Sequence, residues 1–125
     1  LSVQCSRVPV RSGHMAAVSL RFKGSTPDEK EIIEIWKHYR GEPQMRELPS
    51  APHPPLIVRD EVDRPQPVKD RGAGKGMAVS VGRLRPCPVM DIRFITLSHN
   101  TIRGAAGGAI LTAELLKAQG YLDRG

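Results

Sequence analysis

The sequence predicts an α+β fold, in which a mostly antiparallel or mixed sheet carries helices on one face. Three observations support this class. Short segments rich in Val, Ile and Leu read as strands, and connections of hairpin length join most of them. Two other stretches show helical spacing, so the predicted order is strand-strand-helix-strand-strand-strand-helix. With 125 residues, 26% charged and 39% hydrophobic, the chain has the size and composition of one globular domain.

The first two strands are predicted over residues 3–10 and 14–23, with Arg11-Ser12-Gly13 as a short hairpin connection. Because side chains alternate across a strand, one face of the second strand carries a row of residues. They are His14, Ala16, Val18, Leu20 and Phe22. Arg7 on the first strand and His14 on the second therefore flank one bend.

A helix is predicted after these strands. Thr26 suits its N-cap, Pro27 its first helical position, and Glu29 completes a capping box. Four apolar residues at helical spacing form the face that packs on the sheet. They are Ile32, Ile33, Trp36 and Tyr39. Gly41 is the predicted stop.

The middle of the chain is rich in proline and polar residues. Residues 42–55 are predicted to be an extended surface segment, followed by a strand at 56–60. Residues 60–76 form a charged, Pro/Gly-rich loop, of a length typical of interfaces and active-site lids. Two further strands are predicted, at 77–85 and 89–98. The last element is a helix with Asn100 as N-cap and Gly120 as C-cap.

The charge and cysteine content narrow the function. A net charge of +6 fits a nucleic-acid-binding domain or a cleft for a small anionic substrate. No run of Lys and Arg interleaves with aromatic residues, which argues against nucleic acid. Cys5 and Cys87 lack CxxC spacing and suit free thiols in a reducing compartment, the cytoplasm. No apolar run is long enough to span a membrane. The chain begins without Met, so we expect it to be a piece of a longer protein.

Two apparent motifs carry no chemistry. The segment GAGKG at 72–76 departs from a phosphate loop because Gly76, not Ser or Thr, follows Lys75, so a mobile loop is favoured. The histidines show no i,i+4 pairing and no cysteine partner at metal spacing, so we expect no metal site. They are His14, His38, His53 and His99.

The segment RGAAGGAIL at 103–111 has more than one interpretation. Glycine inside a helix costs about 1 kcal/mol relative to alanine, so several glycines near one end need a reason. The small residues could allow close packing against another backbone. Alternatively, a cofactor could lie against the bare first turn, where free N–H groups favour anionic groups. The residues alone favour packing.

Arg7 and His14 also have two interpretations. In the simpler one, Arg7 makes a surface ion pair and His14 only ends a strand. In the functional one, the guanidinium binds a carboxylate through two parallel hydrogen bonds, and the neighbouring imidazole moves a proton near neutral pH. Composition does not decide between them.

Three segments together resemble one enzyme family: CSRVPVRSGH, PSAPHPPLIVRDEVDRPQP and SHNTIRGAAGGAILTAELL. They look like the C-terminal part of aspartate-semialdehyde dehydrogenases of the archaeal and fungal branch. The likeness covers nearly the whole chain. It implies part of the C-terminal domain fold of glyceraldehyde-3-phosphate dehydrogenase-like enzymes.

The resemblance implies an NADPH-dependent oxidoreductase of lysine, methionine and threonine biosynthesis. Such enzymes reduce aspartyl-4-phosphate to aspartate semialdehyde and phosphate. A cysteine thiolate displaces phosphate to form a thioester, and hydride transfer then releases the aldehyde. By resemblance, Arg7 binds the substrate carboxylate and His14 is the general acid/base.

The resemblance also assigns the end of the chain. Asn100 would contact the nicotinamide end of the cofactor, and Gly104 and Ala105 would open the last helix beside it. Residues 1–99 would form a partial catalytic and dimerisation domain. Residues 100–125 would form a helix that packs on the NADP-binding domain.

Parts of the enzyme are missing from this sequence. It has no GxGxxG unit for dinucleotide phosphates and no segment resembling the family's nucleophile, so we expect the isolated chain to be inactive and to bind no NADP. The family also implies a homodimer or homotetramer through the sheet, and the 60–76 loop is our candidate for further contacts across that interface. A self-sufficient dimerisation module without chemistry stays open, and a basic nucleic-acid-binding domain is less favoured.

Overall fold

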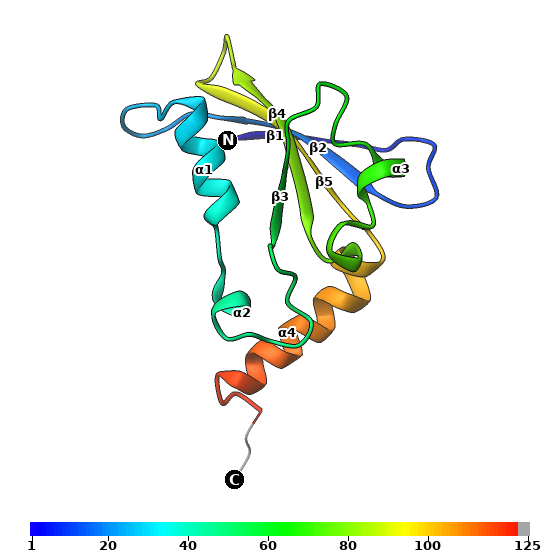
Figure 1. Ribbon diagram of the computed structural model, residues 1–125. Helices are drawn as coiled ribbons and strands as arrows, with labels where there is room; N and C mark the ends of the chain where they lie inside the picture. The colour runs from blue at the N-terminus through cyan, green and yellow to red at the C-terminus, as the bar shows by residue number, and fades with distance from the viewer. Residues whose placement is uncertain (123–125) are drawn as a thin grey trace.

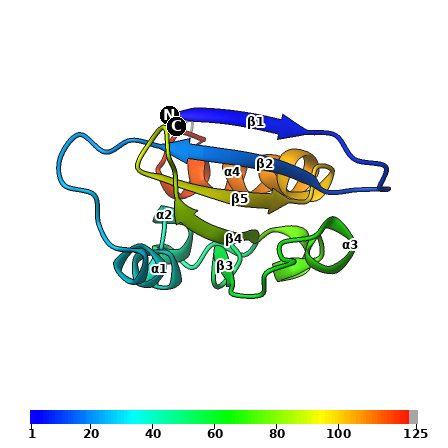
Figure 2. The same cartoon turned by 90° about the horizontal axis from the view of Figure 1, so that it is seen from above.

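The computed structural model describes residues 1–122, and its centre is a five-stranded sheet in the order β1-β2-β5-β4-β3 (Figures 1 and 2). The strands are β1 (Ser2–Ser6), β2 (His14–Leu20), β3 (Leu56–Arg59), β4 (Val79–Pro86) and β5 (Ile92–Ser98). Neighbouring strands are antiparallel except β3 and β4, which are parallel. The predicted mixed sheet and α+β class are confirmed.

Elements pack on both faces of this sheet. On one face, Phe94 of β5 lies opposite Val18 of β2, and the Trp36 ring packs edge-to-face on Phe94 with centroids 5.0 Å apart. Trp36 belongs to α1 (Glu29–His38). Arg59 lies in register with Gly82, and Gly82 with Ile95, so Arg59 is on the opposite face from Phe94.

α3 (Pro67–Asp70) lies on the side of that second face, because Asp70 pairs with Arg59. The helices therefore lie on both faces of the sheet, whereas the sequence predicted them on one face. The physical reason is the buried Asp70 carboxylate, which draws the predicted 60–76 loop back onto the sheet. Within that stretch the chain forms α3 and a 3-10 turn, η1 (Ala73–Gly76).

The ends of α1 differ from the prediction. Asp28, not Thr26, is the N-cap, and its Oδ1 accepts a hydrogen bond from the Glu31 N–H at 2.8 Å. A carboxylate at this position also complements the helix dipole, which explains why Asp28 displaces the Thr26 capping box. The helix ends at His38 with Tyr39 as C-cap, so Gly41 is not its stop. Gly41 instead begins the next helix, α2 (Glu42–Met45).

The segment 42–55 is partly buried, contrary to the prediction. Gln44 in α2 is 7% exposed, and its Nε2 donates to the Pro52 carbonyl at 3.1 Å. Leu48 packs with Met77 and Leu111 in a buried cluster. Leu111 comes from α4 (Gly107–Ala118), so this cluster fixes the last helix against the segment after α2 (Figure 1).

Both strands of the first hairpin are shorter than predicted. β1 ends at Ser6 and β2 ends at Leu20, so residues 7–13 form a wider bend than Arg11-Ser12-Gly13. Pro9 has no N–H for the ladder, which explains the early end of β1. The Val10 N–H bonds to the Val8 carbonyl at 2.8 Å and closes a tight turn inside this bend.

Ser80 on β4 has a buried hydroxyl group without a hydrogen-bond partner in the described part of the chain, and its substitution measures the cost of that group. Its side chain is fully buried, and its Oγ has no hydrogen-bond partner among residues 1–122. A buried hydroxyl without a partner costs about 1–3 kcal/mol. We expect Ser80→Ala to raise the free energy of unfolding by about 1 kcal/mol in urea denaturation. Leu97→Ala, at the position opposite Ser80, should lower it by about 3 kcal/mol. A loss of stability in Ser80→Ala would contradict the unpaired hydroxyl.

Because Asp70 is buried and ionised, we expect the folding stability of the chain to depend on pH. Burial alone would raise the pKa of Asp70, but hydrogen bonds from Arg64 and the Gln66 N–H outweigh it and lower the pKa below its usual value. A lowered native pKa means that the stabilisation is present above the unfolded-state pKa of about 3.9 and is lost as pH falls below it. Asp70→Asn should therefore destabilise the chain by about 3 kcal/mol at pH 7, with a smaller difference at pH 3.

The matched control for this measurement is Asp63→Asn. Asp63 belongs to the same segment, but its ion pair with Lys69 is about half exposed. The free energy of unfolding of the Asp63→Asn variant should stay close to that of the unsubstituted chain at both pH values. An equal pH response of the two variants would show that the Asp70 carboxylate is not the group that titrates.

Candidate functional site

A cavity of about 310 Å³ lies at the bend between β1 and β2. Figure 2 shows this bend at the end of the sheet where β5 leads into the last helix. The cavity is lined by the bend itself and by one residue after β5. The lining residues are Arg7, Val8, Val10, Arg11, Ser12, Gly13, His14 and Asn100. The structure thus brings three sequence-predicted residues, Arg7, His14 and Asn100, to one hollow.

Gly13 gives the bend its shape. Its φ of +109° lies in the left-handed region that favours glycine, and the residue is buried. The Gly13 N–H donates to Asn100 Oδ1 at 2.9 Å, which ties the bend to the segment after β5. Because the amide oxygen of Asn100 is engaged, its NH₂ group is the part that the side chain can offer to a ligand.

Arg7 and His14 are both exposed at the rim of this cavity. Arg7 is the first residue after β1, and His14 begins β2 opposite Ser98. Neither forms an ion pair with any residue that the structure describes. The guanidinium is therefore available for a carboxylate, and the imidazole for proton transfer. The surface ion pair of the simpler interpretation is not observed for Arg7.

The start of the last helix is set by His99, which sequence reasoning missed. The Ile102 N–H donates to His99 Nδ1 at 3.2 Å, and Thr101 Oγ1 lies 3.2 Å from the same nitrogen. Asn100 is therefore not the N-cap, because its side chain is used by Gly13. The signal for this was a histidine directly before the Asn-Thr pair, in a place where a ring nitrogen can accept a backbone hydrogen bond.

Gly104 and Ala105 do not line the cavity of Arg7 and His14. They belong to a π-helical turn, η2 (Ile102–Ala106), that precedes α4, where a single continuous helix was predicted. Ala105 has non-helical angles, with φ −141° and ψ −105°. The Gly104 N–H already donates to the His99 carbonyl at 3.0 Å. Both residues are exposed, so a flat ligand surface can approach the turn but meets few free N–H groups.

The glycines of α4 serve close packing. A Cβ on Gly107 would collide with Met77 Sδ and would lie 3.1 Å from the Ile102 carbonyl oxygen. The packing interpretation of RGAAGGAIL thus holds for Gly107. Gly120, with φ +80°, lies just beyond the end of α4 as predicted for a helix terminator.

The segment 72–76, which was predicted to be a loop, contains the 3-10 turn η1. Gly74 and Lys75 both have left-handed angles, and a Cβ on Gly74 would lie 2.8 Å from Ala78 Cβ. The turn therefore packs tightly against the start of β4. The hydrogen bonds that close it run from Gly76 to Gly72 and from Met77 to Gly74, with N···O distances of 3.1 and 3.0 Å.

The cysteines lie away from the cavity. Cys5 is exposed on β1, and Cys87 lies in the turn between β4 and β5. Hydrogen bonds from the Met90 and Val89 N–H groups lower the pKa of Cys87, helped by the Ser19 hydroxyl. Neither thiol lines the cavity, and neither forms a hydrogen bond with His14 within residues 1–122, so neither is placed as a nucleophile paired with that imidazole.

Within residues 1–122, no three His, Cys, Asp or Glu side chains gather in a way that suits a metal ion. No helix described by the structure combines the length and hydrophobicity needed to cross a bilayer.

From the shape of the bend we expect alanine substitutions at two glycines, Gly13 and Gly24, to differ in their effect on stability. Gly13→Ala places a side chain at φ +109° and sets its Cβ 3.0 Å from Pro67 Cβ, so it should lower the free energy of unfolding by about 2 kcal/mol. Gly24→Ala is the control, because nothing lies within 4 Å of its Cβ position and its φ is not left-handed. Thermal unfolding should show no loss for Gly24→Ala. Equal effects of the two substitutions would contradict the observed bend.

Comparisons with known proteins identify the family of this chain. Residues 1–103 match the family described as "Semialdehyde dehydrogenase, dimerisation domain". Aspartate-semialdehyde dehydrogenase of Aspergillus fumigatus is 49% identical over 94% of the chain and 34% of its own length. Malonyl CoA reductase (NADP) of Metallosphaera sedula is 44% identical over 99% of the chain and 35% of its own length.

A solved structure shows the same fold. The crystal structure of aspartate semialdehyde dehydrogenase with NADP from Candida albicans superposes with a TM-score of 0.83 at 42% identity. The match covers 93% of this chain and 33% of that one. The chain thus spans about a third of the relatives it matches. The family match over most of the sequence and the shared fold show that the chain belongs to the semialdehyde dehydrogenase dimerisation-domain family.

Proposed function

We propose that this chain is the C-terminal part of an NADP-dependent aspartate-semialdehyde dehydrogenase, and that it supplies the substrate clamp and the acid/base of the active site. The observation that carries the proposal is the convergence of Arg7, His14 and Asn100 on one cavity. The enzyme would act in lysine, methionine and threonine biosynthesis in the cytoplasm. The nucleophilic cysteine and the dinucleotide-binding domain would come from additional polypeptide, so the chain alone would be inactive.

Arg7 binds the carboxylate of the substrate. Its guanidinium is exposed at the cavity and free of ion pairs to described residues, which leaves both edges of the planar group available. Two parallel N–H···O bonds would fix the distance and orientation of the carboxylate. Fixing one end of a short substrate places its acyl carbon at a defined position along the cavity.

His14 moves the proton that the reaction requires. It is held by the β2–β5 ladder opposite Ser98, while Gly13 next to it is fixed by Asn100. An imidazole nitrogen can accept and return a proton, so His14 would take the thiol proton as the nucleophile forms, and it would give a proton back to the thiolate when the aldehyde is released. The backbone holds the base rigidly, and the side chain remains open to a substrate.

Asn100, Gly104 and Ala105 suit the nicotinamide end of NADP. The NH₂ group of Asn100 is uncommitted to Gly13, and the exposed η2 turn presents glycine and alanine with little side-chain bulk. When bound, NADPH supplies the hydride. Residues 100–122 would pack on the NADP-binding domain, which is supported by exposed Ile110 (55%) and Leu116 (37%) on α4, while residues 123–125 lie outside the described residues.

A homodimer or homotetramer would form through the sheet and the 60–76 segment. The accessible surface is 8211 Å², whereas a folded monomer of 13.7 kDa should expose about 6,600 Å². The excess exceeds the ~800 Å² that each partner buries in a standard interface. Val62 and Val68 in that segment are 85% and 71% exposed, so apolar side chains are available for contact.

The Metallosphaera relative supports a second candidate, reduction of malonyl-CoA with NADP as cofactor. Malonyl-CoA also carries a free carboxylate beside an activated acyl group, so the Arg7 guanidinium would serve either substrate. An assay of both substrates decides between them.

The proposal is tested in a chimera in which this chain replaces the homologous third of the Aspergillus fumigatus enzyme. His14→Ala should lower kcat by about 10²–10⁴-fold, the usual value of general acid/base catalysis. Arg7→Lys should instead raise KM by at least about tenfold, because a lysine cannot bind a carboxylate in the bidentate way. Steady-state NADPH formation from aspartate semialdehyde and phosphate measures both.

Arg40→Lys is the control, since Arg40 lies beyond α1 and away from the cavity. Arg11 also lines the cavity, and an effect of Arg11→Lys in place of Arg7→Lys would reassign the clamp. An inactive chimera together with a dimeric chain would favour a dimerisation module without chemistry. Salt-dependent DNA binding by the chain would favour the nucleic-acid alternative.

A further inference from the structure

The bend that carries His14 rests on α3, a segment far away in the sequence. A Cβ placed on Gly13 would lie 3.0 Å from Pro67 Cβ and 3.4 Å from Pro67 Cα. Arg71 Cβ would be 3.5 Å from the same position. Gly13 and Pro67 are both buried, so the backbone of the bend contacts α3 directly. Movement of α3 would therefore move Gly13 and the residue that follows it.

Asp70 holds α3 in place. A helix of four residues has too few backbone hydrogen bonds to be stable by itself. Asp70 is 1% exposed, and its Oδ2 accepts from the Gln66 N–H at 2.7 Å, which closes the start of α3. The same Oδ2 accepts from Arg64 Nε at 2.7 Å, and Arg64 Nη2 donates to Oδ1.

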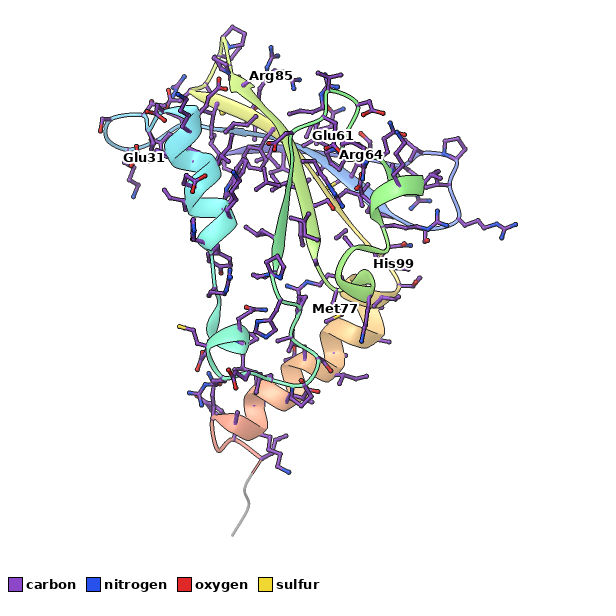
Figure 3. All side chains as sticks on the ribbon, in the orientation of Figure 1. Glu31, Glu61, Arg64, Met77, Arg85 and His99 are labelled. Carbon is purple, nitrogen blue, oxygen red and sulfur yellow. The ribbon has the colours of Figure 1, made fainter. Side chains whose placement is uncertain are left out.

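The Asp70 carboxylate also ties α3 to the sheet. Arg59 of β3 places its Nε 2.9 Å from Asp70 Oδ1. The direction of this N–H does not suit a hydrogen bond, so the contact is an ion pair. Figure 3 shows Arg64 between the sheet and α3, with Glu61 beside it. The Arg64 carbonyl oxygen would lie 2.9 Å from a Cβ on Gly82, so this segment lies directly against β4.

We propose that Asp70 is a positioning residue for His14. The contacts run from Arg59 on the sheet to Asp70, from α3 through Pro67 to Gly13, and from there to His14. Asn100 holds Gly13 through its amide hydrogen bond, so the bend is fixed by two independent supports. The inference rests on the proposed role of His14. A buried charge with two arginine partners is a weak source of stability compared with apolar packing, which fits a role in geometry.

The first test follows the Gly13 amide in the chain by NMR-detected hydrogen exchange. Asp70→Asn should speed Gly13 exchange by about tenfold or more, because α3 no longer supports the bend. The amide of Ile95 in central β5 reports the loss of global stability, and Gly13 should still exchange faster than Ile95 in this variant, which separates local opening of the bend from global unfolding. Asp63→Asn is the matched control, with an exposed carboxylate in the same segment. Unchanged Gly13 exchange in folded Asp70→Asn would overturn the proposal.

The second test is kinetic and uses the chimera described above. Asp70→Asn should lower kcat by about tenfold or more while KM changes less than about threefold, because the acid/base is displaced and the Arg7 clamp is kept. Asp63→Asn should match the unsubstituted enzyme. Equal kcat in Asp70→Asn and the unsubstituted enzyme would refute the positioning role.

A second variant covers the case in which Asp70→Asn does not fold. Pro67→Gly leaves every charge in place and removes the Cβ that touches Gly13. It should give the same faster Gly13 exchange and the same loss of kcat, and normal values of both would overturn the proposal. An inactive unsubstituted chimera would contradict the proposed function alone, since Gly13 exchange in the chain still decides whether Asp70 and Pro67 hold the bend.

Discussion

The hydrogen bond from the Gly13 amide to Asn100 Oδ1 joins the first hairpin to the segment after the last strand. Gly13 and Asn100 both line the cavity, so this hydrogen bond is part of the cavity wall. It holds Gly13, which has a left-handed φ, in the bend between Arg7 and His14. Because the Asn100 side chain accepts this hydrogen bond, it does not cap the following helix. His99 then performs the capping through its ring nitrogen. One hydrogen bond from a backbone amide thus helps to set both the shape of the bend and the start of η2.

The sheet around this join is only partly covered by the chain itself. In the strands, residues 80–82 of β4 and Ile92 and Leu97 of β5 are buried, while all of β1 is exposed, including Val3 at 49%. An edge strand without a charge or proline is a surface that proteins normally cover. The accessible surface is also larger than expected for a folded monomer of this mass. These observations fit a domain whose sheet is completed by contacts with further polypeptide.

Much of the fold could be predicted from the sequence, because hydrophobic alternation and helical spacing are local signals. The strands of the two hairpins and the position of α1 in the sequence followed from them, but the order of the strands in the sheet did not. The errors occurred where tertiary contacts decide. Asp28 caps α1 in place of Thr26 because its side chain accepts a backbone hydrogen bond. Leu48 is buried because Met77 and Leu111, which are distant in the sequence, pack against it. That Arg7 and His14 meet was predicted from the family resemblance, but that Asn100 joins them was not. Asp70 has no local signal, since its partners Arg59 and Arg64 are recognised only in three dimensions.

The exposure of Arg7 and His14 has a physical explanation in this arrangement. A guanidinium and an imidazole that wait for a substrate cannot be neutralised by neighbours of their own chain, so they have to sit at a rim. Rigidity must then come from the backbone, which Gly13, Asn100 and α3 hold from below. A buried carboxylate is a costly way to anchor a short helix, yet it fixes α3 in one orientation, where sliding apolar contacts would permit several. Polar burial at Asp70 and polar exposure at Arg7 and His14 are therefore two consequences of one requirement, a fixed bend that carries free charges.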